Sequence, residues 1–199
     1  MKIESAQDPS SIDSVFSALT EREAQILIRL PFRVGVWISS SDTTGGAEAE
    51  ARELKTLETI VSSYAQEYLK SEFVQKLMER TFSAKADWSR WTQGVERVPE
   101  ECAQLMMRLE SLLSARELAA FRENLVDIAL AVAMVYREES GSTDTPVSSG
   151  GFLDSALRVL GFGRAQEESH VNISLAERKA LRQLAAALKV PDPVRAMSR

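Results

Sequence analysis

Hydrophobic positions recur with the spacing of amphipathic helices along nearly the whole chain. Between residues 48 and 69, steps of three and four residues separate the apolar side chains, which places them on one stripe: Leu54, Leu57, Val61, Tyr64 and Tyr68. The segment after Pro99 has the same spacing from Cys102 to Leu113. No segment combines period-two alternation with β-branched enrichment, so the pattern predicts an all-α protein.

Two segments are apolar on nearly every side. They are AQILIRLPFRVGVWI (24–38) and LVDIALAVAMVY (125–136). A helix without a polar face must be surrounded by other helices, so we expect these two to be the central helices of a bundle. Pro31 falls inside the first, and we expect it either to kink that helix or to begin a second one.

The starts of three helices carry the Ser/Thr-x-x-Glu pattern of a capping box, at Thr20, Ser114 and Ser174.

The high content of Ser, Thr and Gly in residues 139–150 predicts a flexible surface loop, and we expect a short apolar helix after it. We expect residues 1–10 to be a disordered tail. Together these features predict a single domain over 1–199, a bundle of about seven or eight helices.

The spacing of the apolar positions predicts that a helix–loop–helix unit is duplicated within the chain. The apolar positions of Glu53–Tyr64 match those of Glu177–Leu188. Each segment follows an apolar helix and a polar, Gly-containing loop, and the second loop is the longer, from about 139 to 173. This predicts a pseudo-duplicated bundle.

The same segments resemble the TerB-like family of tellurite-resistance-associated helical domains. The resemblance covers residues 20–190 and rests on the apolar helix with LP, the acidic loop and Glu-x-x-x-Leu helix after it, then IALAVAMVYREESG, SGGFLDSALRVLGFG and ISLAERKALRQLAAAL. The family's Ala-Asp-Gly turn is replaced in the first copy by Ser41-Asp42-Thr43-Thr44-Gly45. The resemblance implies an all-helical fold, an acidic surface that binds divalent cations, and a role in stress response.

Composition and charge narrow the class of protein. The net charge of −5 argues against nucleic acid as the main partner, because phosphate binding needs a basic patch. One Cys and one His exclude a disulfide framework and a zinc site of Cys and His from a single chain. We see no secretory signal and no apolar run long enough for a transmembrane segment, so we expect a cytoplasmic protein; peripheral association with a membrane stays open.

Acidic side chains gather around the loop that follows the first apolar helix. We consider Asp42, Glu50 and Glu53 as ligands of a weakly bound divalent cation, Ca²⁺ or Mg²⁺, because hard cations take several oxygen ligands. The alternative is that acids in a first helical turn are favoured by the helix dipole alone. The spacing is not that of an EF-hand.

No pattern of catalytic residues is present in the sequence. Cys102 lies on a helix stripe, where a buried, inert thiol is expected, and His170 lies in a polar loop. The glycines of GFGRAQ (161–166) fit neither a dinucleotide-binding nor a phosphate-binding loop, and we expect them to end the short helix. We therefore predict that the protein is not an enzyme.

The segment DWSRWTQ (87–93) is the best candidate for a contact surface. Trp88 and Trp91 lie one turn apart with Arg90 between them, a composition typical of interface hot spots. Core packing is the default alternative for aromatic residues at helical spacing. We predict a TerB-like module of the stress response that binds a protein partner, a cation or both; the alternative is a scaffold or regulator that forms a homodimer and has no ion site.

Overall fold

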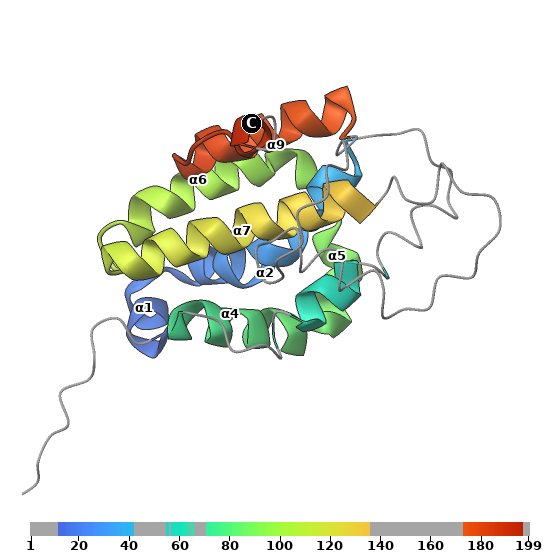
Figure 1. Ribbon diagram of the computed structural model, residues 1–199. Helices are drawn as coiled ribbons and strands as arrows, with labels where there is room; N and C mark the ends of the chain where they lie inside the picture. The colour runs from blue at the N-terminus through green and yellow to red at the C-terminus, as the bar shows by residue number, and fades with distance from the viewer. Residues whose placement is uncertain are drawn as a thin grey trace, which may run out of the picture.

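The structure is a computed structural model, and it describes residues 12–41, 55, 57–63, 65, 71–135 and 173–196. Within these ranges every regular element is a helix and no strand occurs. The helices form a single bundle, which confirms the predicted all-α class (Figure 1).

The α-helices of the described ranges are given in chain order. Their bounds are α1 (Ile12–Ala18), α2 (Glu21–Ser39), α4 (Glu72–Ser83), α5 (Trp88–Trp91), α6 (Val98–Leu109), α7 (Ala115–Val135), α9 (Leu175–Leu188) and α10 (Pro193–Ala196). Two 3₁₀ turns, η1 (Lys85–Asp87) and η2 (Val95–Arg97), flank α5. Residues 57–63 are also helical.

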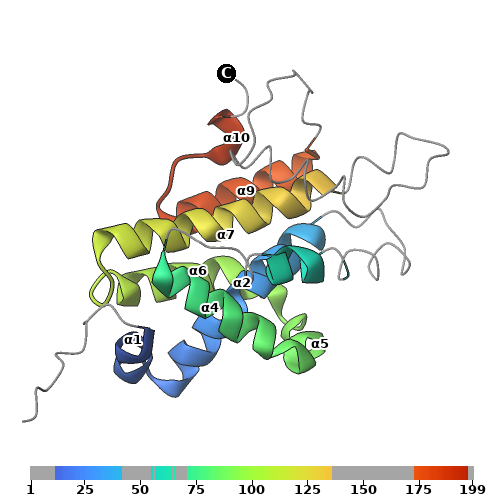
Figure 2. The same cartoon turned by 60° about the horizontal axis from the view of Figure 1, so that its bottom comes forward.

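Helices α2 and α7 lie at the centre of the bundle, as predicted. They contact each other, α6 and α9 lie on one side of them, and α4 lies on the other with α1 at its end (Figures 1 and 2). Leu27, Leu30 and Ile38 of α2 and Phe121 and Leu125 of α7 are fully buried. The two apolar segments of the sequence are therefore the core of the fold.

Pro31 does not begin a second helix. Helix α2 runs continuously from Glu21 to Ser39 with Pro31 inside it, so that alternative is wrong, and the kink stays a prediction. The residues on either side, Leu30 and Phe32, are buried, and their packing offsets the hydrogen bond that proline cannot donate.

The predicted capping boxes form at two helix starts and half-form at a third. Thr20 and Ser174 each accept a hydrogen bond from the backbone of the third helical residue, and the Glu side chain there accepts one in return. Ser114 accepts from the Glu117 backbone at 3.2 Å, but the Glu117 carboxylate accepts from Ser71, the N-cap of α4. This bond ties the start of α7 to the start of α4.

Gly35 lets the helix that follows the acidic loop lie directly on α2. A Cβ atom at Gly35 would stand 2.2 Å from Cδ1 of the buried Leu57, so the Leu57 side chain would have to shift. The absence of a side chain here sets how closely the two helices approach.

Several predictions concern residues outside the described ranges. They are the tail 1–10, the loop 139–150 and the short helix after it. The duplication, which rests partly on Glu53, also stays a prediction. Among the helices that are described, none is both long and apolar enough to cross a membrane.

Candidate functional site

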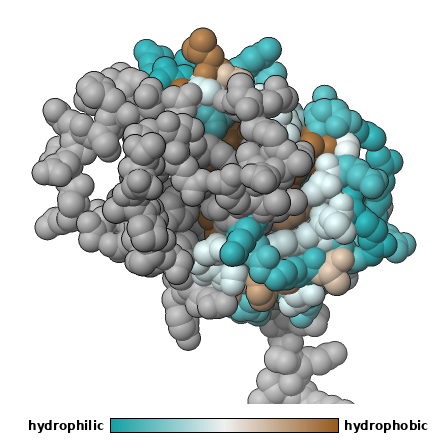
Figure 3. Space-filling model, turned by 90° about the vertical axis from the view of Figure 1, so that its right-hand side faces the viewer, coloured by the Kyte–Doolittle hydropathy of each residue, from teal (hydrophilic) through white to brown (hydrophobic). Residues whose placement is uncertain are grey.

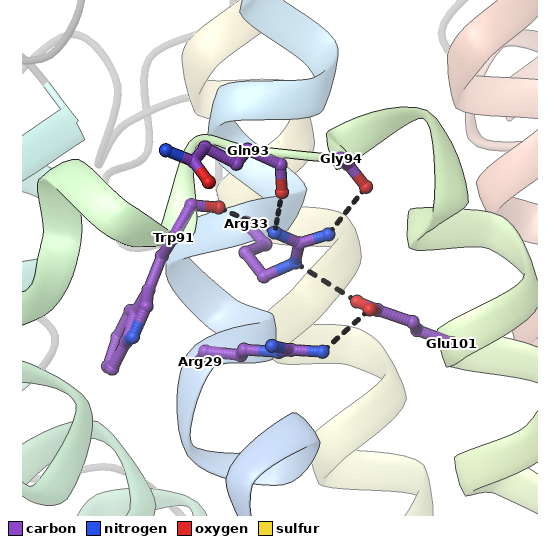
Figure 4. Close-up of polar contacts among 6 residues, drawn as sticks. All are labelled: Arg29, Arg33, Trp91, Gln93, Gly94 and Glu101. Carbon is purple, nitrogen blue, oxygen red and sulfur yellow. Dashed lines mark hydrogen bonds and ion pairs between the residues drawn. The ribbon is translucent and has the colours of Figure 1, made fainter.

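A buried arginine of α2 holds the turn that follows α5. Arg33 is only 3% exposed, and its guanidinium points at three backbone carbonyls (Figure 4). Nη1 donates to the carbonyl oxygens of Trp91 (2.6 Å) and Gln93 (2.7 Å), and Nη2 donates to that of Gly94 (2.7 Å). Arg33 thus supplies donors to the carbonyls where the short helix ends, and the Gly94 carbonyl also accepts from the backbone N–H of Arg97.

The carboxylate of Glu101, in the first turn of α6, completes this cluster. It accepts from Nε of Arg33 at 3.0 Å and from Nη2 of Arg29, one helical turn earlier in α2, at 2.8 Å. The Glu101 side chain is 10% exposed. A carboxylate in this first turn is also favoured by the dipole of α6. We call Arg29, Arg33 and Glu101 the arginine cluster.

The arginine cluster fixes the path of the chain between α5 and α6. A guanidinium carries five N–H groups in a rigid fork, and Arg33 uses four of them in these hydrogen bonds. Gly94 has φ 64°, in the left-handed region that favours glycine, so a residue with a side chain would be strained at this position of the turn. We call residues 91–97 the clamped turn.

The outer side of the clamped turn is open to solvent. Gln93, Gly94, Glu96 and Arg97 are exposed, and Trp91 is half-buried. In Figure 4 the Trp91 ring points away from the guanidinium that its own carbonyl contacts. The result is an aromatic side chain on a rigid turn, beside exposed polar groups of both charges.

The two predicted interface tryptophans lie in different surroundings. Trp88 is 6% exposed, stacks on Phe32 with ring centroids 4.4 Å apart, and donates from Nε1 to the carbonyl of Thr81 at 3.1 Å. The Trp91 ring meets Phe32 edge-on at 6.1 Å. Trp88 therefore belongs to the core, which was the default alternative, and of the two only Trp91 is partly exposed. Whether Trp91 forms an interface stays a prediction.

The three residues predicted to bind a cation, Asp42, Glu50 and Glu53, lie outside the described residues. Elsewhere, in the ranges that the structure describes, no three Asp, Glu, His or Cys side chains gather as a metal site would require. The cation site therefore stays a prediction.

Cys102 is fully buried, as the sequence predicts. Burial raises the pKa of its thiol far above the ordinary value, with a smaller effect from the charge of Glu101, so the thiolate that would act as a nucleophile is disfavoured. His170 and the glycines at 161 and 163 lie outside the described ranges.

The arginine cluster is not among the features predicted from the sequence. The available signal was the pair Arg29 and Arg33, four residues apart in a segment that is otherwise apolar on every side. A charged side chain on such a helix must have a buried partner. The spacing of the two arginines does not show which carboxylate and which carbonyls accept their hydrogen bonds.

Comparison with known proteins does not identify a relative of this chain. The chain matches no protein-family model, no curated protein and no solved structure. The TerB-like resemblance therefore stays a prediction from the residues.

Proposed function

We propose that this protein is a non-enzymatic helical module of the TerB-like kind that acts in stress response by binding a protein partner at the clamped turn. The observation that supports the proposal most is the set of hydrogen bonds from Arg33 to the carbonyls of Trp91, Gln93 and Gly94. They hold a partly exposed tryptophan in place before any partner arrives.

A surface that is already ordered binds at a lower entropic cost than one that must be ordered on contact. Tryptophan and arginine are also the residues most enriched at binding hot spots. The exposed face of the turn adds Arg97 and Glu96 beside Trp91, so an aromatic anchor has polar groups at its rim. These features together suit a protein ligand.

Replacing Trp91 by Ala is expected to weaken binding of the partner protein without unfolding the helical bundle. Wild-type protein and the variant would be used as baits in native cell extract, and the protein enriched by the wild type would then be purified and titrated. A lost anchor at a hot spot should weaken the Kd by about tenfold or more. Met107→Ala, at an exposed position of α6, is the matched control and should leave the Kd unchanged. Equal binding by wild type and Trp91→Ala would contradict the proposal.

The alternative is a scaffold that forms a homodimer through the same tryptophan. Sedimentation of the wild type decides between the two. A dimer that dissociates on Trp91→Ala favours the scaffold, and a monomeric wild type ends that alternative.

The proposal includes weak binding of a divalent cation by Asp42, Glu50 and Glu53. The support is the concentration of acids on both sides of one loop, whose mutual repulsion a cation would relieve. Ca²⁺ or Mg²⁺ at about ten times its Kd should then raise the melting temperature by about 3–6 °C, by mass action.

Glu53→Gln should abolish this rise without unfolding the protein. Glu48→Gln removes a charge from the same acidic segment but not from the three ligands, so it should keep most of the rise. If neither calorimetric heat nor a shift of melting temperature is seen at millimolar cation, the acids serve only to start the helix.

A further inference from the structure

One side of α9 carries a regular stripe of exposed residues. Leu175, Lys179, Arg182, Ala186 and Lys189 follow one another in steps of four, three, four and three, and all five are exposed. This spacing places the first four on one line along the helix, opposite the buried Leu181, Leu184 and Leu188, and Lys189 follows as the C-cap of α9 with φ 55°. We call these five residues the α9 stripe.

The α9 stripe is positively charged, although the whole chain carries −5. All three of its ionisable residues are cations, whereas Glu177, the acid of α9, is buried in the capping box. Arg182 contacts Asp192 at 3.2 Å and Lys189 contacts Glu110 at 2.9 Å, but both cations remain more than half exposed. Lys179 pairs with no carboxylate among the described residues. An approaching anion can therefore still reach all three cations.

The stripe also has the shape that helix packing requires. Leu175 at its start is 85% exposed, and Figure 3 shows a small hydrophobic area among hydrophilic groups at the top of the molecule, on the side where α9 begins. Ala186 near the other end is small enough for a second backbone to come close. Positions three and four apart form the ridges that pack between two helices.

We propose that the α9 stripe docks an acidic amphipathic helix of a partner protein, which pairs carboxylates with Lys179, Arg182 and Lys189 and covers Leu175. Charge complementarity selects the acidic partner, and the exposed leucine selects a protein with an apolar side chain over a polyanion such as nucleic acid. A single leucine offers too little apolar surface to hold a membrane. The stripe lies on α9, apart from the clamped turn, so each surface is tested by its own substitutions.

The probe is a synthetic helical peptide with Glu at the three positions that face the cations and Leu at the position that faces Leu175. Fluorescence anisotropy should show binding that weakens as salt rises. The triple variant Lys179→Gln, Arg182→Gln, Lys189→Gln should weaken the Kd by about tenfold or more, since three ion pairs are lost. Leu175→Asn should also weaken it.

The matched control neutralises three cations on other elements, Arg22→Gln, Lys76→Gln and Lys85→Gln, and so changes the net charge equally. It should shift the Kd by less than about threefold. The proposal is overturned by any of three results: no binding up to about 1 mM peptide, an equal loss in both triple variants, or tighter binding to duplex DNA or phosphatidylserine vesicles than to the peptide.

Discussion

Replacing Arg33 by Met is expected to lower the free energy of unfolding by about 3–5 kcal/mol, because it removes a buried cation together with the four hydrogen bonds that it donates. The carboxylate of Glu101 would lose the more buried of its two cations, and the carbonyls of Trp91, Gln93 and Gly94 would each lose a hydrogen bond inside the protein. Methionine fills a similar volume, so the loss reports the polar contacts more than a cavity.

Urea unfolding followed by circular dichroism measures this change. Arg29→Met is the matched control, because Arg29 contacts the same carboxylate but its side chain is 31% exposed, and solvent there replaces much of the lost interaction. We expect its loss to be about 1 kcal/mol or less. Adding Glu101→Met to Arg33→Met should restore part of the stability, since it removes a buried carboxylate that the single variant leaves with only the partly exposed Arg29. Equal losses for the two arginines would contradict the role assigned to Arg33.

Replacing Trp88 by Ala is expected to cost about 3–5 kcal/mol, the range for a large aromatic side chain removed from a core. The indole stacks on Phe32, meets Phe82 edge-on at 6.3 Å, and donates to the carbonyl of Thr81. The substitution would leave a cavity between α2, α4 and α5 together with an unpaired carbonyl.

Trp91→Ala serves as the comparison, because its ring is half-buried and makes one edge-on contact. Trp91→Ala should lower the free energy of unfolding by clearly less than Trp88→Ala does. If the protein forms a dimer through Trp91, Trp91→Ala should also lower the apparent mass in solution. If Trp88→Ala left the urea midpoint unchanged and lowered the mass in solution, Trp88 would be an interface residue and its placement in the core would be wrong.

Much of the fold could be predicted because it follows from local rules. The apolar segments 24–38 and 125–136 could be stable only inside a bundle, and they are its centre. Thr20 and Ser174 cap their helices because the partner Glu lies three residues away in the chain, a distance that sequence shows directly. The half-formed box at Ser114 shows the limit of such rules. The Glu117 carboxylate accepts a hydrogen bond from Ser71 instead, and only the packing of α4 against α7 brings that residue near.

The candidate site could not be predicted for the same reason. Arg33 and Glu101 are separated by 68 residues, and three of the four groups that accept from Arg33 are backbone carbonyls, which carry no signal in the sequence. Both tryptophans sit at helical spacing, so spacing could not tell which of them is buried. Trp88 is buried because it stacks on Phe32, a contact that only the packing of α5 against α2 produces.

Amide hydrogen exchange on Arg33→Lys is the most direct test that the clamped turn is held in place by the arginine. Lysine keeps the charge beside Glu101 but cannot span three carbonyls with a rigid fork. The backbone amides of Gln93 and Arg97, which donate to the carbonyls of Arg90 and Gly94, should exchange at least about tenfold faster in the variant. The amides of α7 around Leu125 and Ile128 report global opening and should change much less. An unchanged rate in the turn, or an equal rise in the turn and in α7, would contradict the clamp.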